Sequence, residues 1–202
     1  LGQIRVPDLD GSLKWMAKLG NVLYVLAGPD EPPADVLKVH ATWRGWGWNN
    51  VDKNYSPRGK HQIRWGFGDA IAAYDLAQNK LLWRHDNPLI DSRSMGVVDN
   101  KLFYYVPAKK LVCLDRLSGG VLWANEDHDK LALIEDEAHG LVGTPGFRTT
   151  YMLLAPPVGV LIQGQKRANV LGFSIDDGRF LWSKRKHHNN PNMLYVGGRL
   201  FI

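Results

Sequence analysis

The sequence predicts an all-β fold, a partial β-propeller built from four-stranded antiparallel blades. The first observation behind this prediction is an eleven-residue phrase that occurs four times. In every copy the second position is apolar, the seventh is glycine or asparagine and the last is tryptophan; the copies span residues 5–15, 73–83, 113–123 and 172–182. The second observation is a shorter phrase, a tight turn followed by a hydrophobic run, at residues 20–24, 99–103 and 197–201, with a weaker copy at 157–161.

Each phrase has the form of a β-hairpin, because short apolar runs flank a polar turn. Gly119-Gly120 and Asp177-Gly178 supply the positive φ that tight hairpin turns require. Two hairpins in series form a four-stranded antiparallel unit. Repetition of such a unit along the chain is how a β-propeller is built.

The spacing of the repeated tryptophans divides residues 1–202 into blades. Trp83 and Trp123 lie 40 residues apart, which is the length of one plain blade. The longer intervals indicate insertions at about 28–66 and 124–150, and a new blade is expected to start near residue 193. Blade ends are expected at Trp15, Trp83, Trp123 and Trp182. Four blade ends make about half a ring, so we expect a fragment of a longer chain.

The copies Ala73-Tyr74-Asp75 and Cys113-Leu114-Asp115, each followed by a turn and a tryptophan, resemble the tryptophan-docking repeat of the PQQ-like (pyrroloquinoline-quinone) propellers. Pro7 and Ser174 depart from that repeat at the Asp position. The resemblance covers nearly the whole chain apart from the insertions. It implies a ring of usually eight blades, of which this chain would form about four, with each tryptophan packed between adjacent blades. It also implies a periplasmic or secreted protein. Enzymes, assembly scaffolds and sensors share the repeat, so it predicts fold better than activity.

The composition is that of a globular β protein. Apolar residues make up 45% and charged residues 22%, and no run of about 18 apolar residues exists to span a membrane. The net charge of +5 is mild and its basic residues are scattered, so nucleic acid is not an expected partner. Cys113 is the only cysteine, so no internal disulfide and no Cys-x-x-Cys-His haem site can form; we expect a buried structural thiol.

The first insertion, about 28–66, is the first candidate for function. In propeller topology, the loop between the second and third strands of a blade opens on the same face as the blade-to-blade linkers. The insertion carries four tryptophans, which can stack on a flat ring or a sugar, and arginines that can grip carboxylates. The candidate ligand- or cofactor-binding residues are Trp46, Trp48, Asn49, Arg58, His61 and Arg64. The alternative is a lid that packs its aromatic side chains onto a neighbouring blade or domain.

The second candidate is the linker after Trp182, which contains His187, His188 and Asn189. Such side chains can ligate a metal or act as a general base. Adjacent residues of an extended chain point in opposite directions, however, so the two histidines are not expected to share one metal. A polar turn is the alternative, favoured by the similar His85-Asp86-Asn87-Pro88 after Trp83.

The acidic stretches at 126–129 and 135–139 match no ligand spacing known for calcium loops, so we expect a solvated linker and predict no metal site. We therefore expect a binding or scaffold propeller that uses its loop face for a protein or small-molecule ligand, with the remaining blades of the parent chain as further partners. The alternative is a PQQ-dependent quinoprotein dehydrogenase that oxidises an alcohol or sugar, with PQQ and calcium as cofactors. The single cysteine speaks against it, because the adjacent-cysteine disulfide of many such alcohol dehydrogenases cannot form. A haem-bearing or sugar-active propeller is a third class.

Overall fold

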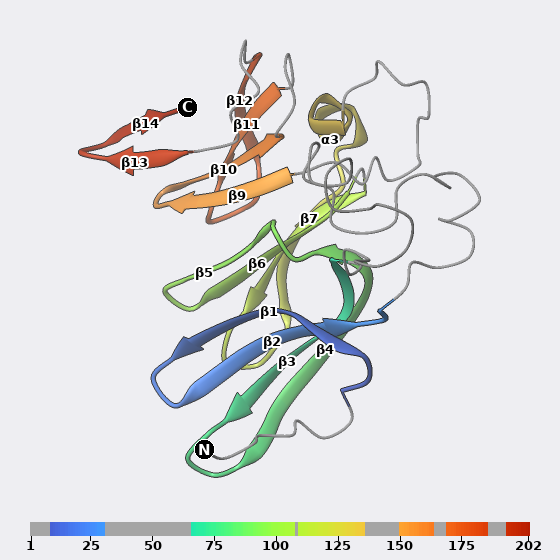
Figure 1. Ribbon diagram of the computed structural model, residues 1–202. Helices are drawn as coiled ribbons and strands as arrows, with labels where there is room; N and C mark the ends of the chain where they lie inside the picture. The colour runs from blue at the N-terminus through green and yellow to red at the C-terminus, as the bar shows by residue number, and fades with distance from the viewer. Residues whose placement is uncertain (1–8, 31–65, 108, 136–149, 164–168, 186–192) are drawn as a thin grey trace, which may run out of the picture. The chain divides into compact units, whose positions relative to one another are not determined.

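The computed structural model describes residues 9–30, 66–107, 109–135, 150–163, 169–185 and 193–202 (Figure 1). Within these residues about two thirds of the chain is β-strand, and one helix is present. The strands are β1 (Ser12–Leu19), β2 (Val22–Gly28), β3 (Phe67–Asp75), β4 (Lys80–Asp91), β5 (Met95–Val98), β6 (Lys101–Val106), β7 (Lys110–Asp115), β8 (Val121–Asn125), β9 (Thr150–Ala155), β10 (Val158–Gln163), β11 (Asn169–Ser174), β12 (Phe180–Arg185), β13 (Leu194–Val196) and β14 (Arg199–Phe201), and the helix is α3 (His128–Glu135).

The strands form consecutive antiparallel meanders. Three sheets have four strands each, in the orders β1-β2-β3-β4, β5-β6-β7-β8 and β9-β10-β11-β12, and β13 pairs with β14 in a two-stranded sheet. Because every strand pairs with its neighbour in sequence, each sheet is one repeat of the predicted unit. The prediction of a partial all-β propeller is confirmed.

The same local geometry recurs in the second hairpin of each four-stranded sheet. The tryptophan lies on the fourth strand and faces a small residue on the third: Trp83 opposite Ala73, Trp123 opposite Cys113 and Trp182 opposite Gly172. The strand register shifts directly after each small residue. A small residue is needed there, since a Cβ on Gly172 would lie 2.2 Å from the ring of Trp182.

The structure places Trp15 differently from the sequence expectation. Trp15 lies on β1, the first strand of its sheet, and pairs with Leu26 on β2. Trp15 precedes the turn at Gly20 by only five positions, whereas Trp83 precedes the turn at Asp99 by sixteen. Five residues cannot supply both the end of a fourth strand and a complete first strand.

The segment 85–88 also differs from the expected linker. His85 pairs with Ile71 and Asp86 with Ala70, so both residues belong to β4. The next pair is Gly68 with Ile90, which leaves a bulge at 87–89 that includes Leu89 with a φ of 60°. The resemblance of this segment to the one at 187–190 therefore does not indicate a shared linker turn.

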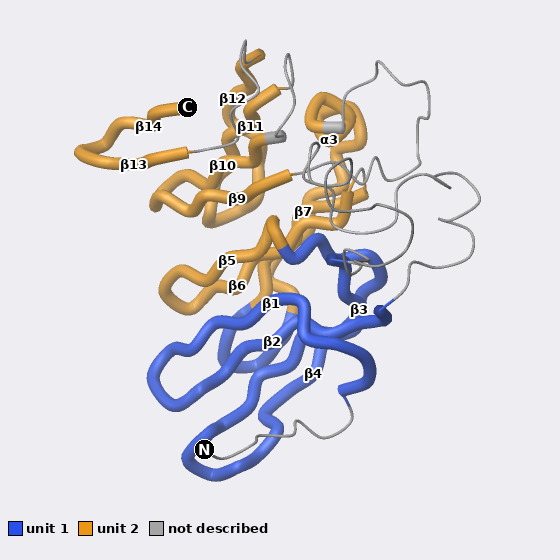
Figure 2. Tube along the Cα trace, viewed as in Figure 1, with its two compact units in different colours: residues 1–92, 115–120 blue, residues 93–114, 121–202 orange. Residues whose placement is uncertain are grey.

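The chain divides into two compact units, which Figure 2 colours separately. Unit 1 comprises residues 1–92 and 115–120 and contains the sheet β1–β4 with the turn between β7 and β8. Most of its buried apolar residues come from the central strands β2 and β3, and β4 adds Ile90; the largest fully buried side chains are Tyr24, Leu26, Phe67, Ile71, Tyr74 and Ile90.

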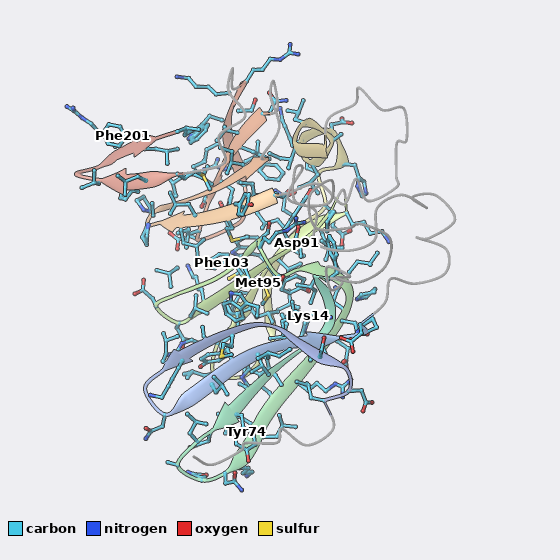
Figure 3. The ribbon with its side chains drawn as sticks, viewed as in Figure 1. Lys14, Tyr74, Asp91, Met95, Phe103 and Phe201 are labelled. Atoms are coloured by element: carbon cyan, nitrogen blue, oxygen red, sulfur yellow. The ribbon has the colours of Figure 1, made fainter. Side chains whose placement is uncertain are left out.

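Unit 2 comprises residues 93–114 and 121–202. Its core joins side chains from β6, β7, β10 and β11 with two from helix α3: Phe103, Tyr105, Leu111, Cys113, Leu131, Ile134, Leu161, Leu171, Phe173 and Ile175. Cys113 is buried, as predicted, and Phe103 lies inside this cluster (Figure 3).

Each complete sheet has a turn end and a loop end. In unit 1 the N–H of Leu76 donates to the carbonyl of Asn21, so the β1–β2 and β3–β4 turns lie together at the turn end. In unit 2 the N–H of Ile175 and the carbonyl of Pro157 join the two turns of β9–β12 in the same way. The connections β2–β3 and β10–β11 therefore leave from the opposite end, the loop end.

Candidate functional site

All nine sequence-predicted ligand residues lie outside the described residues: Trp46, Trp48, Asn49, Arg58, His61, Arg64, His187, His188 and Asn189. What the structure describes is the framework from which their segments emerge. The prediction that the 28–66 insertion and the 187–190 linker share one face stays a prediction.

The insertion leaves unit 1 through a narrow glycine-lined base. It starts after Gly28 at the end of β2 and ends at the start of β3, so it is a loop-end connection. A Cβ on Gly28 would lie 2.6 Å from the Cα of Gly68, and one on Gly11 would lie 2.1 Å from the carbonyl oxygen of Gly28. Three glycines thus allow three backbone segments to approach closely at this point.

The β2–β3 pairing is complete without the insertion. Pairs run without a break from Val22 opposite Asp75 to Ala27 opposite Ala70. A hairpin of this register needs only a short loop to join its strands. The insertion therefore adds length that the sheet does not require.

The sequence did not predict a buried polar segment at the end of β4. In unit 1, the side chain of Asp91 is 0% exposed and Ser92 is buried beside it, while the Ser92 N–H donates to the carbonyl of Gly66 at 3.4 Å. Figure 3 labels Asp91 on this stretch. A polar run that connects two strands is usually solvated, so the sequence carried no signal for this burial.

In unit 2, Ser94 and Thr150 form the corresponding buried polar pair. The Oγ of Ser94 donates to the carbonyl of Thr150 at 2.7 Å, and the Ser94 carbonyl accepts from the N–H of Tyr105 at 3.2 Å. Thr150 is 0% exposed, and its Oγ1 has no hydrogen-bond partner among the residues that the structure describes. Such a hydroxyl is costly unless something satisfies it, so this strand start suits a water molecule or a polar ligand atom.

The acidic stretch after Trp123 has a structural role. Residues 128–135 form helix α3, and Asp127 caps its start by accepting the N–H of Lys130 at 3.1 Å. The helix buries Leu131 and Ile134 in the core of unit 2, and its Leu133 carbonyl accepts from the Asn169 side chain at 2.9 Å. Residues 126–129 are exposed, as expected of a solvated stretch, but 128–135 form a helix that packs Leu131 and Ile134 on the core instead of an irregular linker. Residues 136–139 lie outside the described residues.

Within the described ranges, no group of three or more His, Cys, Asp or Glu side chains could hold a metal ion. Likewise, no helix in this part of the chain is long and apolar enough to cross a membrane.

At the turn end of unit 1, Trp83 packs on the turn between β7 and β8. Its Nε1 donates to the carbonyl of Arg116 at 3.0 Å, and its ring lies against Gly119. The Arg116 guanidinium lies over the ring of Tyr24 and donates to its hydroxyl at 2.7 Å. These contacts give Trp83 a structural role.

Unit 2 repeats the same contact with Trp123 and the turn between β11 and β12. The Trp123 Nε1 donates to the carbonyl of Ile175 at 3.2 Å, and its ring lies against Gly178. Asn125 adds a hydrogen bond from its side-chain amide to the Gly178 carbonyl at 2.7 Å. In the same turn the Ser174 side chain and the Arg179 N–H lower the pKa of Asp177.

Comparison with known proteins supports the fold. No protein-family model and no curated protein sequence matches this chain. The computationally designed Ika4 protein is similar, with a TM-score of 0.56 and 12% identity over 99% of this chain and 91% of that chain. BamB from Moraxella catarrhalis has a TM-score of 0.50 and 11% identity over 95% of this chain and 39% of that chain.

The quinohemoprotein alcohol dehydrogenase from Comamonas testosteroni has a TM-score of 0.50 and 11% identity, over 88% of this chain and 22% of that chain. BamB and this dehydrogenase are β-propeller proteins. Identities of 11–12% support a shared fold and nothing finer. The chain spans well under half the length of either natural neighbour.

Proposed function

We propose that this chain is a binding propeller of the PQQ-like repeat type, which holds a protein or small-molecule ligand at its loop end through the insertion between β2 and β3. The observation that carries the proposal is the position of that insertion. It leaves a complete strand pair at the glycine base formed by Gly11, Gly28 and Gly68, where the sheet needs only a short loop. Long connections inside compact domains are usually functional when they are not disordered.

The chemistry of the insertion supports recognition. Its four tryptophans offer flat apolar faces, while Arg58, His61 and Arg64 offer donors for carboxylates or hydroxyls. A segment with this aromatic content differs from a plain solvated linker. The proteins of similar fold include BamB as well as an alcohol dehydrogenase, so the fold is compatible with either role.

The alternative is a quinoprotein dehydrogenase with PQQ and calcium at the loop end, acting on an alcohol or sugar. Periplasmic or secreted localisation, and the remaining blades of a parent chain as partners, belong to the proposal in both cases. They are supported by the repeat resemblance.

Calorimetric titration with PQQ, with and without calcium, distinguishes the two roles. A binding propeller without the quinone gives no saturable heat at near-millimolar PQQ. One-site binding that weakens in Trp46→Ala and Trp48→Ala, but not in the turn-end control Leu117→Ala, would favour the dehydrogenase alternative instead, and a dye-linked screen of alcohols and sugars would then test for turnover.

A loop-deletion variant tests the binding role itself. Residues 31–64 are replaced by a short Gly-rich turn, which the β2–β3 pairing can accommodate. We expect an unchanged far-ultraviolet circular dichroism spectrum, and loss of those partners that the intact chain retains from an extract of its host cell. Retention of the same partners by both chains would contradict a binding role for the insertion.

A further inference from the structure

Lys14 is a buried lysine at the loop end of unit 1. Its side chain is only 3% exposed, and its Nζ donates to the Oγ of Ser12 at 2.7 Å. Figure 3 labels Lys14 at β1. Lysine side chains are almost never fully buried, because the ammonium loses its hydration there. A lysine in such a place therefore calls for a specific reason.

A β-bulge in the first strand presents this side chain. The pairing of β1 with β2 shifts between Leu13 and Trp15, so Lys14 is the extra residue of the bulge. Bulges re-aim a side chain and are frequent beside functional sites. The first strands of the other two four-stranded sheets, β5 and β9, pair with their neighbours without a bulge. The bulge at Lys14 is thus no part of the repeat, and it belongs to the sheet whose β2–β3 connection is the 28–66 insertion.

Asp30, just after the end of β2, supplies a carboxylate to Lys14. Its Oδ1 lies 3.8 Å from the Lys14 Nζ, and its side chain is 66% exposed. An ion pair of this length with one partner in solvent contributes little free energy. The ammonium is therefore fixed inside the protein, whereas its solvent-exposed counterion can be exchanged for another carboxylate.

Three further carboxylates of unit 1 act on a different cation. The Nε of Arg84 donates to the Oδ1 of Asp86 at 2.8 Å. This hydrogen bond raises the pKa of Arg84, and the charges of Asp10 and Asp69 add to the effect. Arg84 offsets part of the negative charge that would otherwise repel an anion bound near Lys14.

We propose that Lys14 is the anchoring cation for a carboxylate of the loop-end ligand, and that Asp30 is the counterion which this carboxylate replaces. The inference rests on the proposed function, since it assigns ligand chemistry to the end of the sheet from which the insertion leaves. The ligand carboxylate accepts a charge-assisted hydrogen bond from the Lys14 Nζ. The Ser12 hydroxyl, which accepts from Lys14, donates its own hydrogen to the same carboxylate.

Nuclear magnetic resonance titration of the whole chain with carboxylate probes tests this assignment. The probes are glutarate, a small dicarboxylate, and a hexaglutamate peptide, at constant ionic strength, with glutaramide as the neutral control. The Lys14 ¹³Cε signal and the amide of Gly28, which pairs with Ser12, report binding. We expect saturable shifts with a Kd on the order of 1–10 mM, and none with glutaramide. Tighter binding of glutarate would indicate a small-molecule ligand, and tighter binding of hexaglutamate an acidic segment of a partner protein.

Two matched variants test the exchange of counterions. Asp30→Asn removes the competing carboxylate, so it should tighten probe binding roughly two- to fivefold, the change that corresponds to an exposed ion pair. Asp86→Asn is the control, because Asp86 pairs with Arg84, and it should leave the Kd unchanged. Lys14→Met removes the ammonium and should abolish the shift of the Gly28 amide. Asp30 is exposed, so its variant is expected to fold even where Lys14→Met does not.

Three results would overturn the inference: no shift with either probe in Asp30→Asn up to about 20 mM, equal Kd values with and without Asp30→Asn, or an unchanged Gly28 shift in Lys14→Met. Lys14 would then be an inward-pointing charge that protects the edge strand β1 from pairing. The proposed function fails on a separate observation, the retention of the same partners after deletion of residues 31–64, so the two failures can be told apart.

Discussion

At the scale of single residues, the turn glycines are where the repeat is least tolerant of change. Gly119 and Gly178 combine a left-handed backbone with a tryptophan ring less than 3 Å from where a Cβ would be. Each of the two features excludes a side chain independently, so their costs add. The sequence predicted positive φ at both positions, and the structure confirms it.

Gly119→Ala is expected to destabilise the chain by about 2–4 kcal/mol, since it strains the backbone and displaces the Trp83 ring. Gly120→Ala is the matched control one residue along, because its nearest neighbour is the Ser118 Oγ at 3.4 Å. That control should cost less than about 0.5 kcal/mol. Urea unfolding measures both, and equal losses would contradict the account of the turn.

The pKa of Asp177 is a second prediction at this scale. The Ser174 side chain and the Arg179 N–H stabilise its carboxylate, so the pKa lies below the usual range. A lowered carboxyl pKa contributes stability above its unfolded value, and this contribution is lost as the pH falls through the lowered pKa. Carboxyl ¹³C titration of Ser174→Ala should show the Asp177 pKa rising toward its usual value. An unchanged pKa would exclude Ser174 as the main cause.

At the scale of elements, the three hairpins that end in tryptophan follow one rule but meet different surroundings. Trp123 stands between Phe103 and Phe173, with ring centroids 5.8 Å and 6.3 Å away, and also donates to the Ile175 carbonyl. Trp182 lies against Gly172 of its own sheet and is 38% exposed. Local sequence thus predicts the hairpin, while its contribution to stability depends on what packs against it.

Trp123→Ala is therefore expected to cost about 3–5 kcal/mol, and Trp182→Ala only about 1–2 kcal/mol. Chemical denaturation of the two variants compares them directly. A loss at Trp182 as large as that at Trp123 would contradict this expectation, because it would mean that the Trp182 ring is covered as fully as the Trp123 ring.

The elements that the sequence did not predict have physical reasons. The segment 5–15 satisfies the three shared positions of the phrase, but those positions test only eleven residues. The short interval between Trp15 and Gly20 makes the strand that carries Trp15 a first strand. Helix α3 was missed because residues 128–135 are rich in charge and bury only Leu131 and Ile134 fully. The burial of Asp91 depends on tertiary packing, which no local pattern encodes.

At the scale of the whole molecule, fold and function differ in how far the sequence predicts them. Four-stranded units with Trp83, Trp123 and Trp182 in equivalent places follow from periodic signals that recur along the chain. A ligand site does not recur from blade to blade, so no periodic signal marks its residues. Trp46, Arg64 and His187 can therefore be proposed only from their residue types. The binding role therefore stays a proposal, whereas the propeller fold is established.

The chain should also be unevenly stable, and hydrogen exchange would show it. In β6, five of six residues are buried, and the buried side chains of β11 belong to the core of unit 2, while β13 is exposed throughout. Exchange from a sheet needs local opening, whose free energy follows the apolar contacts that are broken.

Amides of β6 and β11 are therefore expected to exchange only through near-global unfolding, and those of β13 and β14 through local opening orders of magnitude faster. Protection of β13–β14 equal to that of β6 would contradict this expectation, because it would mean that the exposure of the β13 side chains does not govern how readily the strand opens.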